Sequence, residues 1–307
     1  MHDKGIVCLR LVVLALCAVA GVLATSAQAD IRLPAIIGDN MVIQAGDRVR
    51  LWGWADPNEA IEVAISWRDF TWGVQADGEG KWEFQMVAPN VGGPYQIMLR
   101  GKNTVTIRNI LCGQVWVCSG QSNMQWPVQR SMNAEQEIAA AKYPKIRLFT
   151  VERRVMETPQ DDCKGQWVEC SPETVGDFTA VGYFFGRELY KELKQPIGLI
   201  HTSWGGTPAE AWMSMRRLKE NPNFAPIVTR YEQAVAVYPE ALAKYKEDLA
   251  KWDEAAAKAK AEGQPAPGGR PNPPMGPGHY QSPAGLYNAM IAPLLSYTIA
   301  GAIWYQG

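Results

Sequence analysis

The pattern of hydrophobic and polar positions changes near residue 108 and divides the chain into two regions. Between residues 30 and 108, short runs of alternating apolar and polar residues are separated by turn sequences such as Asp56-Pro-Asn58. Ile61, Val63 and Ile65 fall on one face of such a run, which is the two-residue period of a half-buried strand. Five or six strands at this spacing predict a small β-sandwich over residues 30–108.

Two turn sequences within this region predict hairpins. The turn at 77–81 would join strands at 71–76 and 82–87, and the turn at 101–103 would join strands at 95–99 and 104–107. Trp52 and Trp54 share one face of a further strand. They could form a platform for a sugar ring, but such a pair more often fills a core, and we expect them there.

From residue 109 to 307 continuous apolar runs replace the alternating ones. Buried strands are predicted at 115–118, 146–149, 196–200 and 300–305, with helices at 178–193 and 209–218 between them. Alternating strands and helices favour a parallel sheet covered by helices on both faces. The predicted fold class is therefore α/β, with a three-layer α/β/α sheet that follows the β-sandwich.

An insertion at about 220–278 interrupts this alternation. A helix predicted over 240–262 carries three acid–base pairs at i,i+4 spacing, namely Glu240/Lys244, Glu247/Lys251 and Glu254/Lys258. Eleven of the sixteen residues from Gly263 to Gly278 are Gly or Pro, which excludes regular secondary structure there. We expect a peripheral spur, and a lid over the functional site is the alternative.

The first 29 residues have the pattern of a secretory signal. Lys4 and Arg10 precede an apolar run that ends near Ala24, and Ala27-Gln-Ala29 offers a cleavage site between small residues. The run is shorter than the ~20 residues that span a bilayer, so a membrane anchor is the weaker alternative. We expect a signal peptide over 1–29, a secreted or periplasmic protein, and no membrane contact beyond the signal.

Composition narrows the classes of partner and cofactor. A net charge of −1 with both signs mixed along the chain gives no support for a nucleic-acid partner. With three histidines and no ligand spacing, we expect neither a metal site nor a cofactor. Cleavage of the signal would leave Cys112, Cys118, Cys163 and Cys170, and an oxidising compartment would allow disulfides in any of three pairings. Cys163 and Cys170 are near enough to close a short loop, whereas Cys118 is expected to be a packed thiol.

Three strand ends carry the candidate chemistry. The strand at 115–118 ends in Gly120-Gln-Ser-Asn123, where Ser122 would lie on a tight turn at the edge of the sheet that binds ligands. An exposed serine beside backbone N–H groups suits a nucleophile, although a Ser/Asn turn that caps a helix is the commoner use of such residues. Met124 rules out the Gly-x-Ser-x-Gly elbow, because the second position after Ser122 is not glycine.

Paired glycines follow the second of these strands. Gly205 and Gly206 could leave backbone N–H groups free to form an oxyanion hole, or they could form a tight turn without chemistry. The third strand, at 302–305, ends in a small polar turn at Gln306 and Gly307.

These stretches together resemble the sialate O-acetylesterase family, which belongs to the SGNH group of serine esterases. The resemblance rests on 116–126, 203–212 and 303–307, with support from 178–183 and 287–294, and it covers the chain from Asp30 onward except the insertion. It implies that Ser122 is the nucleophile and that the N–H groups of Ser122 and Gly206, or else Gly205, line the oxyanion hole. Gln121, Asn123 and Gln306 would then lie in the substrate pocket.

The resemblance also implies groups that fall beyond residue 307. The family has an Asn in a Gln-Gly-Glu-x-Asn motif, of which Gln306 and Gly307 stand here, and a general base in a later Asp-x-x-His motif. Among the histidines of this chain, His2 would leave with the signal, and neither His201 nor His279 has a strong claim to be the base. We therefore expect residues 109–307 to be the C-terminally incomplete esterase domain of a longer protein.

The expected function is that of a secreted carbohydrate esterase. It would remove O-acetyl groups from sialic acid or a related sugar by attack of Ser122, with an O-acetylated glycan as its partner and no cofactor. An acetylxylan or other polysaccharide deacetylase is the nearest alternative, because one fold serves several substrates. A non-catalytic glycan-binding protein that uses the tryptophans of residues 30–108 is the alternative from another class.

Overall fold

A computed structural model describes residues 30–307, so the signal peptide expected over 1–29 lies outside the described residues. The strands are β1 (Val42–Gln44), β2 (Arg48–Trp54), β3 (Ala60–Ile65), β4 (Thr71–Gln75), β5 (Lys81–Val87), β6 (Gly92–Arg100), β7 (Thr104–Gly120), β8 (Tyr143–Thr150), β9 (Trp167–Cys170), β10 (Ile197–Ser203) and β11 (Gly301–Tyr305). The α-helices are α2 (Ser122–Gln125), α3 (Ala134–Ala140), α4 (Ala180–Leu193), α5 (Met215–Glu220), α6 (Ala225–Ala236) and α7 (Tyr238–Ala261). Short 3₁₀ turns lie at Val128–Arg130, Ala209–Trp212, Pro222–Phe224 and Ala292–Leu294, and a π-helical turn lies at Tyr287–Ile291.

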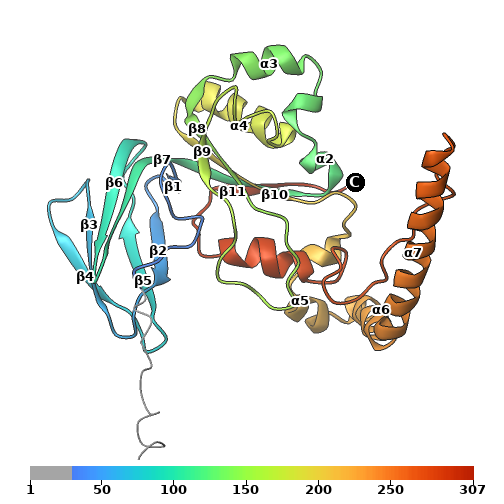
Figure 1. Ribbon diagram of the computed structural model, residues 1–307. Helices are drawn as coiled ribbons and strands as arrows, with labels where there is room; N and C mark the ends of the chain where they lie inside the picture. Colours follow the sequence, from blue (N-terminus) through green and yellow to red (C-terminus); the bar gives the residue numbers. More distant parts are fainter. Residues whose placement is uncertain (1–29) are drawn as a thin grey trace, which may run out of the picture.

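The N-terminal region is a small β-sandwich, as its alternating pattern predicts (Figure 1). The antiparallel pair β2–β5 forms one sheet, and β4, β3, β6 and the first half of β7 form the other. The hairpin between β6 and β7 is confirmed. The hairpin predicted between 71–76 and 82–87 is wrong, because β4 pairs with β3 and β5 pairs with β2. The intervening turn therefore carries the chain from one sheet to the other. A turn sequence predicts where the chain reverses direction. It does not predict which strand the next strand will pair with, because that depends on which side chains become buried.

The two tryptophans of β2 lie on its outward face. Val49, Leu51 and Gly53 are buried on the inward face, whereas Trp52 and Trp54 are only half-buried. The core position expected for this pair is therefore wrong for Trp54, whereas half-buried Trp52 packs against the core. Both rings border a groove of about 340 Å³ between the sandwich and the segment around Pro293, and the guanidinium of Arg32 lies 4.2 Å from the centre of the Trp54 ring.

The C-terminal region is a three-layer α/β/α unit. Its strand order is β11-β7-β10-β8-β9, with the first four strands parallel and β9 antiparallel at the edge. In Figure 1, α2, α3 and α4 cover one face, and the 3₁₀ turn at Ala209–Trp212, α5 and the 287–294 segment cover the other. This arrangement confirms the predicted fold class.

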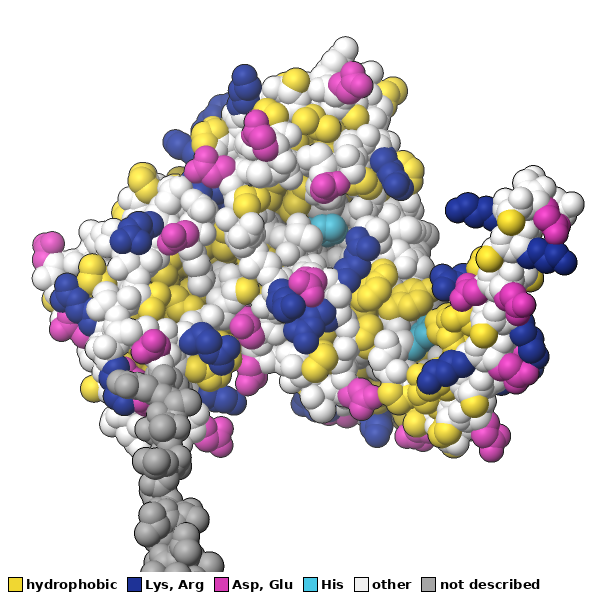
Figure 2. Space-filling model, in the orientation of Figure 1, with side chains coloured by type: hydrophobic (Ala, Val, Ile, Leu, Met, Phe, Trp, Pro, Cys, Tyr) yellow, Lys and Arg dark blue, Asp and Glu magenta, His cyan; other side chains and the backbone are white. Residues whose placement is uncertain are grey.

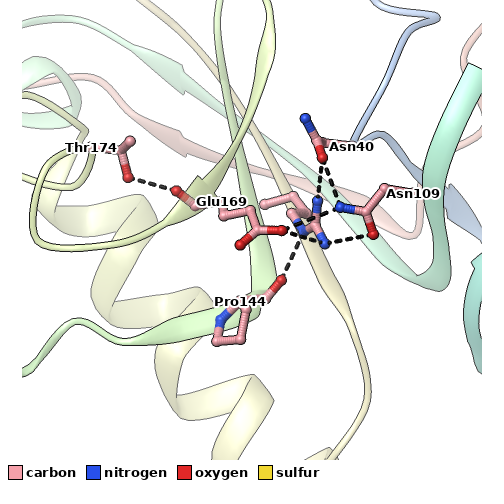
Figure 3. Close-up of polar contacts among 6 residues, drawn as sticks. Asn40, Asn109, Pro144, Glu169 and Thr174 are labelled. Carbon is pink, nitrogen blue, oxygen red and sulfur yellow. Dashed lines mark hydrogen bonds and ion pairs between the residues drawn. The ribbon is translucent and has the colours of Figure 1, made fainter.

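Strand β7 joins the two regions without a break. Its first half pairs with β6 and β1 and its second half with β10 and β11, so the division expected after residue 108 falls inside one strand. Buried Arg147 on β8 contacts residues of both regions close to β7 (Figure 3). Its guanidinium donates to the Pro144 carbonyl, Asn40 and Asn109 at 2.8, 3.0 and 3.3 Å, and it lies 3.1 Å from the Glu169 carboxylate.

The insertion contains one helix beside the body and one that projects from it. Helix α7 buries none of its residues and extends away from the sheet, and Figure 2 shows an open notch between it and the body. Glu247–Lys251 forms as predicted at 2.6 Å, but Lys244 pairs with Asp248, and Glu254 pairs with no cation within residues 30–307. The Pro/Gly-rich segment is irregular, as predicted, and its Pro267 carbonyl accepts a 2.8 Å hydrogen bond from Trp252.

All four cysteines of the described region are unpaired and buried. The disulfide considered between Cys163 and Cys170 is therefore absent, and the packed thiol predicted at Cys118 is confirmed. Burial raises the pKa of each of these thiols to about 12, so they are protonated and unreactive at neutral pH. None of the helices in the described part of the chain has the length and apolar character needed to cross a membrane.

Candidate active site

The three strand ends chosen from the sequence meet at one edge of the sheet. Gly120 at the end of β7 is level with Ser203 at the end of β10 on one side. It is level with Tyr305 at the end of β11 on the other side. Because these strands are parallel and in register, the turns that follow them converge on one point.

Ser122 begins α2 immediately after this edge, and its side chain is exposed. The chain reaches it through Gly120, whose φ of 136° is unfavourable for any residue with a side chain. A Cβ at Gly120 would also overlap the carbonyl of Tyr305, whose oxygen accepts a 2.9 Å hydrogen bond from the Gln121 N–H. The glycine is therefore required by the close approach of β11.

The paired glycines lie directly against Ser122. A Cβ built on Gly205 would stand 3.3 Å from both the Cα and the Cβ of Ser122, so the two backbones are in contact. The Gly205 N–H is already engaged, because it donates a 2.6 Å hydrogen bond to the side chain of Gln125.

The N–H of Gly206, by contrast, is available to a ligand. Gly206 is exposed with φ 75°, and its N–H has no acceptor among the described residues. Its carbonyl accepts a 2.6 Å hydrogen bond from the side chain of Gln281, which holds the loop in place. This geometry favours Gly206 over Gly205 as an oxyanion donor.

The other three candidate pocket residues surround the same edge. The Asn123 side chain donates to the Gly307 carbonyl at 3.2 Å, and the Gln306 side chain donates to the Thr207 carbonyl at 2.9 Å. Gln121, Gly206 and Gln306 line one side of a cavity of about 600 Å³. Helix α6 of the insertion forms the opposite wall with Ile227, Arg230, Tyr231 and Ala234.

Neither described histidine contacts Ser122. His201 is buried, its Nε2 shares a 2.6 Å hydrogen bond with the Ser203 hydroxyl, and its ring packs edge-on against Phe178. Burial, with a smaller contribution from the charge of Arg153, lowers the pKa of His201 to about 3. His279 stacks on Tyr280, and its Nδ1 accepts a hydrogen bond from the Gln281 N–H. Within residues 30–307, no group of three or more His, Cys, Asp or Glu side chains is placed to hold a metal ion.

Several residues of the site escaped the sequence analysis. Gln125 had a detectable signal, because it stands three positions after Ser122 on the same short helix. Tyr280 and Gln281 reach the Gly205–Gly206 turn from a Pro/Gly-rich segment about 75 positions away, and α6 approaches from the insertion. Such long-range contacts leave no local pattern.

Comparisons with known proteins give a consistent picture. The family model described as carbohydrate esterase, sialic acid-specific acetylesterase matches residues 112–251. Sialate O-acetylesterase from Homo sapiens is 31% identical over 305 residues, which cover 92% of this chain and 49% of that protein. Sialate O-acetylesterase from Rattus norvegicus is 34% identical over 231 residues, which cover 70% of this chain and 40% of that protein.

Among solved structures, a carbohydrate acetylesterase from Xanthomonas citri superposes with a TM-score of 0.67 at 30% identity. The match covers 90% of this chain and 51% of that one. The chain thus spans about half the length of the relatives that it matches.

Proposed function

The chain belongs to the sialate O-acetylesterase family, and on that premise we propose that it removes O-acetyl groups from sialic acid or a related sugar with Ser122 as nucleophile. One observation carries the proposal. The exposed Ser122 lies in backbone contact with the Gly205–Gly206 turn, whose outer N–H has no acceptor in the described structure. An attacking hydroxyl and a donor for the resulting oxyanion are thus adjacent.

The proposed reaction has two steps. Ser122 Oγ attacks the acetyl carbonyl carbon, and the N–H groups of Gly206 and Ser122 stabilise the negative oxygen of the tetrahedral intermediate. The intermediate collapses and breaks the bond between the acetyl carbon and the sugar oxygen, which leaves with the proton that Ser122 gave up to the base, and an acetyl ester remains on Ser122. Water then attacks this ester, releases acetate and restores the hydroxyl.

The first step requires a proton acceptor for Ser122, normally a histidine. His201 does not qualify, because it is buried, bonded to Ser203 and neutral. His279 is two positions before Gln281 on the segment that holds Gly206, but the Ser122 hydroxyl makes no hydrogen bond to it. The residues described here therefore supply the nucleophile and the oxyanion site of the proposed reaction.

Release of acetate from O-acetylated sialic acid tests the proposal. The assay should be run with and without added imidazole, which can accept the serine proton in solution, and compared with acetylated xylan. We expect acetate release from the sialic acid substrate in the wild-type protein and none above background in Ser122→Ala. Equal acetate release by the two proteins would contradict the role of Ser122. Faster acetate release from acetylated xylan than from O-acetylated sialic acid would contradict the proposed substrate.

The proposal includes export from the cytoplasm, which rests on the charged and apolar pattern of residues 1–29. Sequencing the N terminus of the mature protein tests it. A mature protein that begins near Asp30 is expected, and one that begins at Met1 would contradict export by this signal.

A further inference from the structure

Three arginines lie within β8 or shortly after it, and the surroundings of Arg147 and Arg153 differ. Burial lowers the pKa of both Arg147 and Arg153, which means that each guanidinium has lost part of its hydration. Around Arg147, the Glu169 carboxylate and three oxygen acceptors take the place of the lost water (Figure 3). Arg153 has no carboxylate partner and no hydrogen-bond acceptor anywhere in residues 30–307. Its one described contact is with the Trp204 ring, 6.0 Å from the guanidinium carbon.

Arg153 stands at the same edge of the sheet as Ser122. The last backbone bond between β8 and the neighbouring strand joins the Val151 N–H to the His201 carbonyl at 2.9 Å, and Arg153 follows two residues later. Its guanidinium lies 6.0 Å from the ring of Trp204, the residue that directly follows β10, so it is near the end of that strand. Because β10 separates β7 from β8, the ends of β7 and β8 are roughly 10 Å apart, about the span of one sugar residue with its substituents.

The side chain that Arg153 contacts connects it to the oxyanion loop. Trp204 directly precedes Gly205, and its N–H donates a 3.2 Å hydrogen bond to the Gly120 carbonyl. The Trp204 ring stacks on Tyr280 at 5.6 Å, and Tyr280 stacks on His279 at 4.9 Å. Trp204 therefore connects the Arg153 guanidinium to the turn that lies against Ser122.

The charges near Arg153 leave it free for an anion. Glu152, its neighbour, lies 3.6 Å from Lys164, and Arg154 contacts the sulfur of Met156. No acid raises the pKa of Arg153. Arg153 therefore keeps its positive charge without a carboxylate partner among the described residues.

We propose that Arg153 binds the carboxylate of an acidic sugar whose acetyl ester lies at Ser122. The proposal rests on the esterase function proposed above and refines it, because it assigns a residue that would distinguish an acidic sugar from neutral xylan. A guanidinium presents paired N–H groups that match the two oxygens of a carboxylate, and a charged hydrogen bond of this kind strengthens where water is partly excluded.

Binding, rather than turnover, tests this proposal. Isothermal titration calorimetry should compare N-acetylneuraminic acid with its carboxyl methyl ester, which keeps the sugar and removes the charge. We expect the wild-type protein to bind the acid on the order of 10- to 100-fold more tightly than the methyl ester. Arg153→Gln should lose that preference and bind both ligands as weakly as the wild type binds the ester. Arg154→Gln, the adjacent control, should keep the preference.

The contrary results are separable from failure of the esterase proposal. Equal binding of the acid and the methyl ester by the wild-type protein, including no binding of either, would overturn the role of Arg153. The role of Arg153 would also be overturned if Arg153→Gln kept the wild-type preference for the acid over the methyl ester. An unfolding temperature equal to that of the wild type would show that this variant is folded. Acid binding that depends on Arg153, with no acetate release that depends on Ser122, would contradict the esterase function alone.

Discussion

Beside Ser122, the ends of β7 and β11 approach so closely that only glycine fits at position 120. Gly120 and Gly205 each face the backbone of another segment, and Gly206 adopts a left-handed conformation between them and solvent. The loop therefore has its shape before any substrate arrives. A donor that is already in position stabilises an oxyanion without reorganising, which is where much catalytic stabilisation arises.

Gly120→Ala tests this close packing. The new methyl group would overlap the Tyr305 carbonyl in a backbone conformation that disfavours side chains, so we expect the free energy of unfolding to fall by about 2 kcal/mol or more. Gly73→Ala on exposed β4 is the matched control, because nothing lies within 4 Å of the added methyl. Urea unfolding measures both, and equal stabilities would contradict the contact.

The buried His201 should make stability fall in acid. Its pKa is about 3 in the folded protein and about 6.5 when unfolded, so below pH 6.5 the unfolded state binds a proton that the folded state does not. Stability from this residue is complete above pH 6.5 and falls by about 1.4 kcal/mol per pH unit between pH 6.5 and 3. Urea unfolding at pH 7 and pH 5 should show a smaller loss for His201→Gln than for the wild type. An identical loss would show that another group dominates.

Among the helices, α7 lies away from the candidate site, whereas α6 borders it. Helix α7 buries none of its residues, whereas α6 forms one wall of the cavity beside Gln121. The expected peripheral spur therefore describes α7, whereas α6 and Met275 are the parts of the insertion that border the cavity.

Replacing residues 242–268 by a short Gly/Ser linker tests this separation. The stability of the remaining chain should change by no more than about 0.5 kcal/mol, because the deleted residues pack on one another rather than on the body. If the protein that lacks residues 242–268 does not fold, α7 supports the core and the separation of α7 from the site is contradicted.

Tyr231→Ala on α6 should instead raise KM for the acetylated sugar while leaving the fold intact.

Local elements followed from the sequence better than their pairings did. The apolar runs at 115–118, 146–149 and 196–200 predicted β7, β10 and much of β8, because buried parallel strands are apolar throughout. The partner of β5 could not be predicted, since the turn at 77–81 is compatible with either sheet. The outward position of Trp52 and Trp54 was missed for a similar reason, because alternation defines two faces without saying which is buried.

At the scale of the whole molecule, one strand and one buried arginine join the β-sandwich to the α/β unit. Arg147 binds Asn40 before β1, Asn109 within β7 and Glu169 on β9, so it contacts segments from both regions. No pattern in the sequence predicts this cluster, because its members are far apart in the chain and none belongs to a motif. The site, by contrast, was recognisable, since each of its three stretches is local and the parallel register brings them together.

Arg147→Met should weaken this junction. It would leave the Asn109 side-chain oxygen and the Pro144 carbonyl without their donor and remove one of the two donors to Asn40, and we expect a loss of about 2–3 kcal/mol in the free energy of unfolding. Arg153→Met provides the matched control, with an expected change within about 0.5 kcal/mol because its guanidinium makes no hydrogen bond or ion pair within residues 30–307. Similar losses in the two variants would argue against a structural role specific to Arg147.

The nucleophilic role of Ser122 is tested most directly by trapping the acetyl-enzyme. The protein is mixed with O-acetylated sialic acid, quenched in acid within seconds, digested and analysed by mass spectrometry. The peptide that contains Ser122 should gain the mass of one acetyl group, and the same peptide from Ser122→Ala should gain none. An acetyl group on another residue, or acetate release by the wild type that survives in Ser122→Ala, would contradict the account.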